Sequence, residues 1–139
     1  MDTPQNTASL FALMLLRDRL LPDLLKEDID EITYWAGKNI AREIDLNGIA
    51  AIENFFTDAG FGHLTMLSQK AAIQRWQLDG PIIEARLDDN PKASFELEAG
   101  FLAQQTEQQV GFGAETQTEI SKNKVVFTVM TEVAATLQD

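Results

Sequence analysis

Two carboxylate pairs are the first residues in this chain whose spacing could do chemistry. Glu96 and Glu98 are two positions apart in a segment with helical spacing, so they project about 200° apart and cannot share one substrate. Glu115 and Glu119 share one face of a predicted strand, where two carboxylates could hold a hard cation, but a solvated strand face is the ordinary explanation and the one we favour. Glu98 neighbours Gly100, and we keep it as a candidate functional residue.

Other catalytic or metal-binding groups are scarce. His63 is the only histidine and the chain has no cysteine, so a zinc site would need His63 together with distant carboxylates. Serine and threonine occur without a histidine or lysine at motif spacing, and Gly111-Phe112-Gly113 is too short to imply a phosphate loop. We therefore expect a protein that is not an enzyme, without a catalytic residue, a metal site or a cofactor.

Charge and composition limit the partners. The net charge of −11 repels phosphate backbones and anionic lipid surfaces, so we expect no nucleic acid. The apolar run from Leu10 to Leu16 is far shorter than the roughly 20 residues of a membrane span, and no basic segment precedes it as in a signal peptide. The absence of cysteine fits a reducing compartment, and we expect a cytoplasmic protein forming a single domain over residues 1–139.

Glu96 and Glu98 lie in the stretch from Ser94 to Glu107, which is predicted to be the central helix. Phe95, Ala99, Leu102 and Thr106 recur at helical spacing and form an apolar face. Gly100 lies inside this face, where a glycine costs about 1 kcal/mol relative to alanine unless a backbone or a ligand must approach closely.

The remaining pattern predicts an α+β fold. N-terminal helices are expected over residues 10–25, with a kink or restart at Pro22, over 29–43 with Ile29, Ile32, Ala36 and Ile40 inward, and from 47 to 59. A hairpin follows, with strands around 64–66 and 76–78 joined by a turn at 68–70. A short helix over 82–87 should point Arg86 and Glu84 outward. A second hairpin pairs 112–120 with 125–130, and the tail from Val133 is expected to fray. We predict N-terminal helices packed on a twisted antiparallel sheet of about four strands, with the central helix preceding the C-terminal hairpin.

Aromatic residues are numerous for a small domain. Each is most simply a core residue, but together they leave room for an apolar cavity. The predicted ligand-pocket residues are Trp35, Phe55, Glu98, Gly100, Phe101 and Phe127.

Four stretches together resemble the bacterial YslB-like family of uncharacterised proteins. They are Tyr34-Trp35-Ala36-Gly37-Lys38 with Ala41-Arg42, Phe55-Phe56 with Ala59-Gly60-Phe61-Gly62, Gly80-Pro81-Ile82-Ile83 with Arg86-Leu87, and Phe95-Glu96-Leu97-Glu98-Ala99-Gly100-Phe101. They span most of the chain in order. The family has no established activity to transfer.

More distantly, residues 95–129 are similar to the closing helix and hairpin of the 4-vinyl reductase domain, which shares its fold with the small subunits of the TRAPP vesicle-tethering complex. This resemblance implies a plait of helices on one sheet face, frequent homodimers and, in some relatives, a channel for an acyl chain or another apolar molecule. Relatives often carry cysteines here and this chain has none, so the resemblance implies noncovalent binding at most.

Three functions therefore remain open. The first is a homodimeric binding module that holds an apolar small molecule beside the Gly100 helix. The second is a dimeric adaptor, which requires an exposed apolar patch on Leu13, Leu16, Leu20 or Leu24. The third, with the least support, is an enzyme that uses Glu98 as acid or base.

Overall fold

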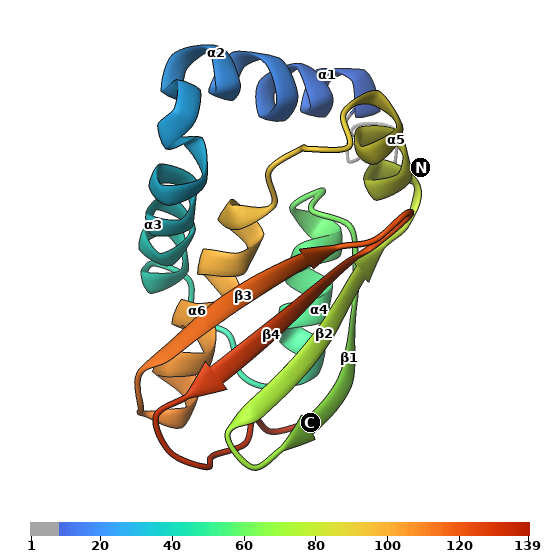
Figure 1. Cartoon of the computed structure of the whole chain (residues 1–139). Helices are drawn as coiled ribbons and strands as arrows, with labels where there is room; N and C mark the ends of the chain where they lie inside the picture. The colour runs from blue at the N-terminus through green and yellow to red at the C-terminus, as the bar shows by residue number, and fades with distance from the viewer. Residues whose placement is uncertain (1–8) are drawn as a thin grey trace.

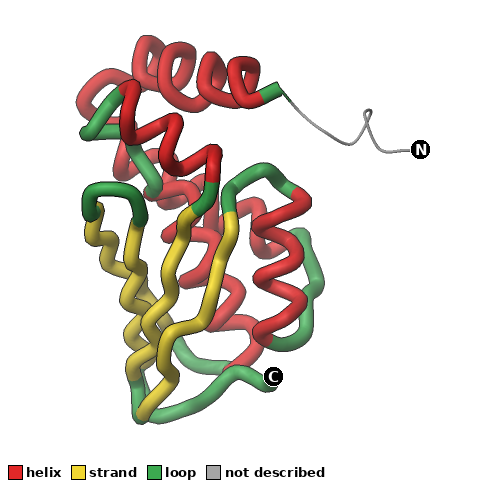
Figure 2. Tube along the Cα trace, turned by 90° about the vertical axis from the view of Figure 1, so that its right-hand side faces the viewer, coloured by secondary structure: helices red, strands yellow, loops and turns green. Residues whose placement is uncertain are grey.

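The computed structural model describes residues 9–139, which form a helical layer against one face of an antiparallel sheet (Figures 1 and 2). The sheet has four strands in the order β1-β2-β4-β3. These strands are β1 (His63–Lys70), β2 (Ile73–Asp79), β3 (Ala114–Ile120) and β4 (Val125–Thr131). The predicted α+β class, the two hairpins and the strand number are confirmed. The first hairpin turns at Ala71 and Ala72, directly after the predicted turn at 68–70.

Helix α6 (Glu96–Val110) is the central helix of the domain, as predicted. It lies between the sheet and helix α3, and every residue from Glu98 to Thr106 is buried. Trp76 of β2 and Phe127 of β4 face one another in register within the core beneath it. Apolar side chains on the two central strands, β2 and β4, point into the core and cover one face of the sheet. A central strand buries more side-chain surface than an edge strand, so β4, the most strand-like segment in sequence, lies in the middle of the sheet.

Helix α3 (Ile29–Arg42) presents a different face from the predicted one. Its buried residues are Thr33, Gly37 and Ala41, whereas Ile32 and Ile40 are exposed. The prediction of an inward face through the isoleucines was wrong because α3 packs on α6 through small residues. Small side chains at spacing four allow two helix backbones to approach more closely than isoleucine permits.

The N-terminal segment crosses one end of the molecule as a continuous rod (Figure 1). It comprises α1 (Leu10–Leu15), the π-helical turn η2 (Leu16–Leu20) and α2 (Leu21–Leu25), followed by the 3-10 turn η3 (Lys26–Asp28). Pro22 lies in the first turn of α2, directly after the π-helical turn, so the helix type changes beside this proline while the helical backbone continues through it. The π turn ends with Leu21 N–H donating to the Leu16 carbonyl.

Helices α4 (Ile49–Asp58) and α5 (Pro81–Asp89) complete the fold, and the C-terminal tail packs beside α4. Leu137 is buried and its backbone exchanges two hydrogen bonds with the Gln69 side chain, at 2.6 and 3.2 Å. The Gln138 carbonyl accepts a hydrogen bond from Ile49 N–H at 2.7 Å. The expectation of a frayed tail was therefore wrong, because these contacts satisfy its backbone. Across residues 9–139, no helix has the length and apolar character required to cross a membrane.

Candidate functional site

Gly100 and Gly37 mark the closest approach of α3 and α6. A Cβ atom built on Gly100 would lie 1.9 Å from the Tyr34 carbonyl oxygen, and one built on Gly37 would lie 2.1 Å from the Leu97 carbonyl oxygen. Each glycine therefore accommodates the backbone of the opposite helix. Of the two explanations for a glycine in the apolar face of α6, the structure shows a neighbouring backbone at this position.

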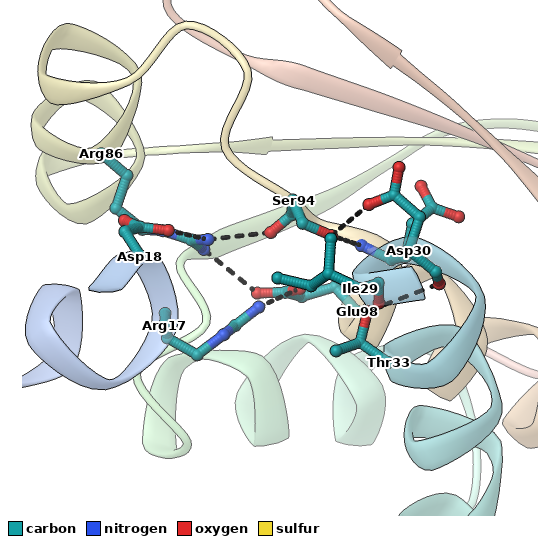
Figure 3. A network of polar contacts seen from close by, with 9 residues as sticks. Arg17, Asp18, Ile29, Asp30, Thr33, Arg86, Ser94 and Glu98 are labelled. Atoms are coloured by element: carbon teal, nitrogen blue, oxygen red, sulfur yellow. Dashed lines mark hydrogen bonds and ion pairs between the residues drawn. The ribbon is translucent and has the colours of Figure 1, made fainter. Parts of the chain in front are cut away.

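Glu98 is fully buried and belongs to a charged cluster between α6, the N-terminal segment and α5 (Figure 3). Its Oε1 accepts a hydrogen bond from Arg17 Nη2 at 2.7 Å, and its Oε2 lies 3.6 Å from Arg86 Nη1. Arg86 binds Asp18 through both carboxylate oxygens, at 2.8 and 2.9 Å. Two arginines and two carboxylates thus balance in charge, which is the condition for burying ionised groups.

Further contacts hold the cluster in place. Arg86 Nη2 donates to the Ser94 carbonyl oxygen at 2.8 Å, and its guanidinium lies 4.3 Å from the centre of the Phe95 ring. Burial lowers the pKa of Arg17, but attraction to Glu98 and the hydrogen bond between them raise it by more, so the net shift is upward. The cluster attaches the N-terminal segment to the rest of the domain through two ion pairs. Arg17 pairs with Glu98, and the adjacent Asp18 pairs with Arg86.

Arg86 was predicted to point outward and is instead only 2% exposed, so that prediction was wrong. A signal was present in the sequence. Ile82, Ile83, Arg86 and Leu87 form the spacing of one buried helix face, and all four are buried. Arg86 was predicted to be exposed because it is charged, but its position in the helix places it in the apolar face. There it contacts Asp18, an acidic residue 68 positions away in the chain.

Phenylalanine rings fill the space between α4 and α6. Phe55 and Phe101 stack with ring centres 4.6 Å apart, and Phe61 meets Phe56 edge to face at 5.1 Å. The structure thus brings together two of the predicted pocket residues, Phe55 and Phe101, as ring contacts.

The other predicted pocket residues are dispersed. Trp35 is 60% exposed on the outer side of α3, and Phe127 lies in the core of the sheet. Gly100 contacts α3 and Glu98 belongs to the charged cluster. A ligand-binding role for these six residues stays a prediction.

A cleft lies at the end of the molecule where α1 crosses the domain. Its volume is about 450 Å³, and its walls come from α1, the end of α4, the start of β1 and the segment joining β2 to α5. Leu10, Leu13 and Ile82 supply apolar surface, whereas Asp79 and His63 supply polar groups. This volume falls within the roughly 300–1,000 Å³ of small-molecule sites. Sequence reasoning missed the cleft because its walls come from chain segments about 70 residues apart.

A second hollow follows the exposed side of the N-terminal segment. It has a volume of about 510 Å³ and is lined by Phe11, Met14, Leu15 and Leu20 with a few charged neighbours. Phe11 is 73% exposed, and Leu24, one turn beyond this hollow, is 66% exposed. Leu16 and Leu20 are also exposed, whereas Leu13 is half-buried and faces the cleft.

Of the other candidate carboxylates, Glu115 and Glu119 lie on the surface, whereas Glu96 is half-buried. Glu115 accepts hydrogen bonds from the Tyr34 hydroxyl and from Lys38 Nζ, so its charge is compensated by α3. The pKa of Tyr34 is raised. Burial is the largest cause, and the hydrogen bond to Glu115 is the second. Glu119 is exposed on the same strand, and His63 contacts Thr65 Oγ1 at 3.3 Å. In the part of the chain that the structure describes, no group of three or more His, Cys, Asp or Glu side chains is suited to a metal ion.

Comparison with known proteins places the chain in a family. A family model described as "Protein of unknown function (DUF2507)" matches residues 10–130. The chain belongs to the DUF2507 family. The "Uncharacterized protein YslB" of Bacillus subtilis (strain 168) is 40% identical to this DUF2507 chain over 121 residues, which cover 86% of the chain and 82% of YslB. This finding confirms the resemblance to the YslB-like family.

Two solved structures share the fold of this DUF2507 protein. A vinyl-4-reductase family protein from Methanocaldococcus jannaschii superposes with a TM-score of 0.54 at 20% identity, covering 94% of this chain and 83% of its own. The phenol-responsive sensory domain of the transcription activator PoxR, solved with phenol, superposes with a TM-score of 0.59 at 11% identity. The superposition covers 88% of this chain and 75% of the PoxR domain. At these identities the similarity is one of fold.

Proposed function

We propose that this protein is a binding module for an apolar or amphipathic small molecule, held noncovalently in the cleft beside α1. The observation that carries the proposal is the cleft itself: about 450 Å³, apolar on the α1 and α5 sides and polar on the strand side. This site differs from the predicted one beside Gly100, where α3 occupies the space. The phenol-bound PoxR domain supports the proposal, because it demonstrates that this fold can hold a small ligand.

The proposed role is binding without catalysis. Glu98, the candidate acid or base, is 0% exposed and is held by Arg17 and Arg86, so a substrate in the cleft has no route to its carboxylate in this conformation. We also propose a cytoplasmic location, which is supported by a chain without cysteine.

Two measurements test the binding function. Native mass spectrometry of protein purified from its host should show a retained mass, and titration with octan-1-ol, a neutral probe, should shift the amide NMR signals of Gly60 and Gly62 in the cleft wall. Leu10→Trp, which adds bulk to the cleft wall, should weaken octanol binding at least 5-fold. Leu16→Trp adds the same bulk to an exposed position outside the cleft and serves as the matched control. A protein that carries no mass and shows no cleft shifts would refute the function.

The second candidate function is a dimeric adaptor in which a second copy of this chain covers the exposed side of the N-terminal segment. The apolar hollow at Phe11, Leu15 and Leu20 favours it. Residues 10–25 contain two arginines and two aspartates, so this segment is neutral on a chain of net charge −11. Two copies can meet there with less repulsion than elsewhere.

Sedimentation equilibrium tests the adaptor function. The wild-type protein should sediment as a dimer, and Phe11→Glu should sediment as a monomer because it places a charge in the interface. Ile73→Glu, at an exposed apolar position on β2, is the control and should leave the dimer intact. A wild-type protein that remains monomeric at about 100 μM would refute this reading.

A further inference from the structure

The charged side chains around the cleft beside α1 are acidic. Asp58 and Asp79 line it, and among residues 9–139 no lysine or arginine does. The described walls therefore carry two aspartates and no lysine or arginine to compensate them.

Helix dipoles do not reverse this field. Asp58 is the last residue of α4, whose C-terminal end carries roughly half a negative charge, and Pro81 is the first residue of α5, whose N-terminal end carries roughly half a positive charge. Both ends reach the cleft, so their contributions cancel to first order. The two carboxylates then decide the sign of the potential, and the net charge of −11 adds to it.

Apolar surface lies against these carboxylates. Leu10 and Leu13 of α1 form one wall and Ile82 of α5 forms part of another. A ligand that matches both features has an apolar group together with a positive charge. A fatty acid matches the apolar walls but carries a carboxylate that Asp58 and Asp79 repel.

We propose that the cleft selects cationic amphiphiles, meaning an alkyl or aryl group that bears a protonated amine, over neutral and anionic molecules of the same size. This inference rests on the proposed binding function and names the ligand class for the same cleft. Asp79 is partly committed, since it accepts a hydrogen bond from Gln77 Nε2 at 2.8 Å through Oδ2, which leaves Oδ1 for an ammonium group. Asp58 is exposed and forms the rim.

Three probes of equal chain length separate charge from apolar contact: octylamine, octan-1-ol and octanoate. Titration of the full chain, followed by NMR and calorimetry at low salt, should rank the amine first, the alcohol second and octanoate last. An exposed ion pair contributes up to about 5-fold in affinity, so two carboxylates should favour the amine over the alcohol by about 3- to 30-fold. This advantage should shrink in about 1 M salt, where the Debye length is about 3 Å.

A variant with both Asp58→Asn and Asp79→Asn should lose the ranking while it still binds octan-1-ol. Asparagine keeps an oxygen acceptor for Gln77, so the local hydrogen bond survives. The control is the double variant Glu43→Gln with Glu119→Gln, which changes the net charge equally at exposed positions outside the cleft and should keep the ranking.

The outcomes separate the two proposals. If the three probes bind equally, or the Asp58 and Asp79 variant keeps the ranking, the cationic preference is overturned and the binding function survives. If no probe shifts a cleft signal, both are overturned. If the Glu43 and Glu119 control loses the ranking as well, overall charge governs binding, and the assignment to the two cleft aspartates is overturned.

Discussion

Arg86→Leu removes the cation that connects α5 to the N-terminal segment. Leucine retains helix propensity and apolar bulk, but it leaves the Asp18 carboxylate and the Ser94 carbonyl oxygen without their 2.8 Å partners in a buried site. Removing one member of a buried ion pair costs about 3–5 kcal/mol, because the remaining charge is uncompensated. For 139 residues the unfolding entropy is about 0.29 kcal/mol/K, so the expected loss is about 10–17 °C in Tm.

Differential scanning calorimetry and urea unfolding measure this change. Arg75→Leu, the same substitution at an exposed position on β2, is the control and should alter the free energy of unfolding by less than about 0.5 kcal/mol. The double variant Asp18→Leu with Arg86→Leu should recover much of the loss, because apolar residues can replace a buried pair at little cost. If Arg86→Leu unfolds within about 1 kcal/mol of the wild type, the buried cluster does not hold the N-terminal segment and our reasoning is refuted.

Three further substitutions test other parts of the fold. Gly100→Ala should cost about 3 kcal/mol in urea unfolding, because its Cβ would overlap the Tyr34 backbone, whereas Gly113→Ala meets the end of a flexible side chain and should cost less than about 1 kcal/mol. Leu137→Ala should cost about 2 kcal/mol, measured in the same way, and an unchanged midpoint would mean that the tail is not docked. Burial raises the pKa of Glu96, so its stabilising contribution is present below the ordinary pKa of 4.5 and is lost as pH rises through the folded-state value. Glu96→Gln should therefore raise Tm at pH 7 but not at pH 4, and an equal rise at both values would contradict this assignment.

The central helix and the strands could be predicted because large apolar side chains mark them. Phe95, Ala99 and Leu102 recur at the helical period, and the run at 125–130 consists mostly of β-branched and aromatic residues. In both cases the residues that carry the pattern are the residues that become buried. Local spacing was then sufficient to assign the element type, although α6 is buried on all sides from Glu98 to Thr106 and not on one apolar face alone.

The same reasoning failed where small or charged residues do the packing. In α3 the helix interface runs through Thr33, Gly37 and Ala41, and the more hydrophobic isoleucines remain outside. Arg86 lies in an apolar face because Asp18 neutralises it, and no local pattern reports a partner 68 residues away. The cleft shares this property, since its walls meet only when α1 crosses the start of α5. For Arg86, position within the helix period is a better guide than residue type, whereas the packing of α3 and the cleft depend on contacts between segments far apart in the chain.

The π-helical turn at Leu16–Leu20 makes chain length itself a determinant of the shape of the cleft wall. Such a turn holds one more residue than an α-helical turn, so a single-residue deletion there would restore a regular α-helix and rotate the preceding turn by about 100°. Arg17 and Asp18 would keep their anchors while Leu10 and Leu13 swung out of the cleft wall. A relative with a one-residue alignment gap in this turn should therefore present a cleft wall of different shape without any substitution at the cleft.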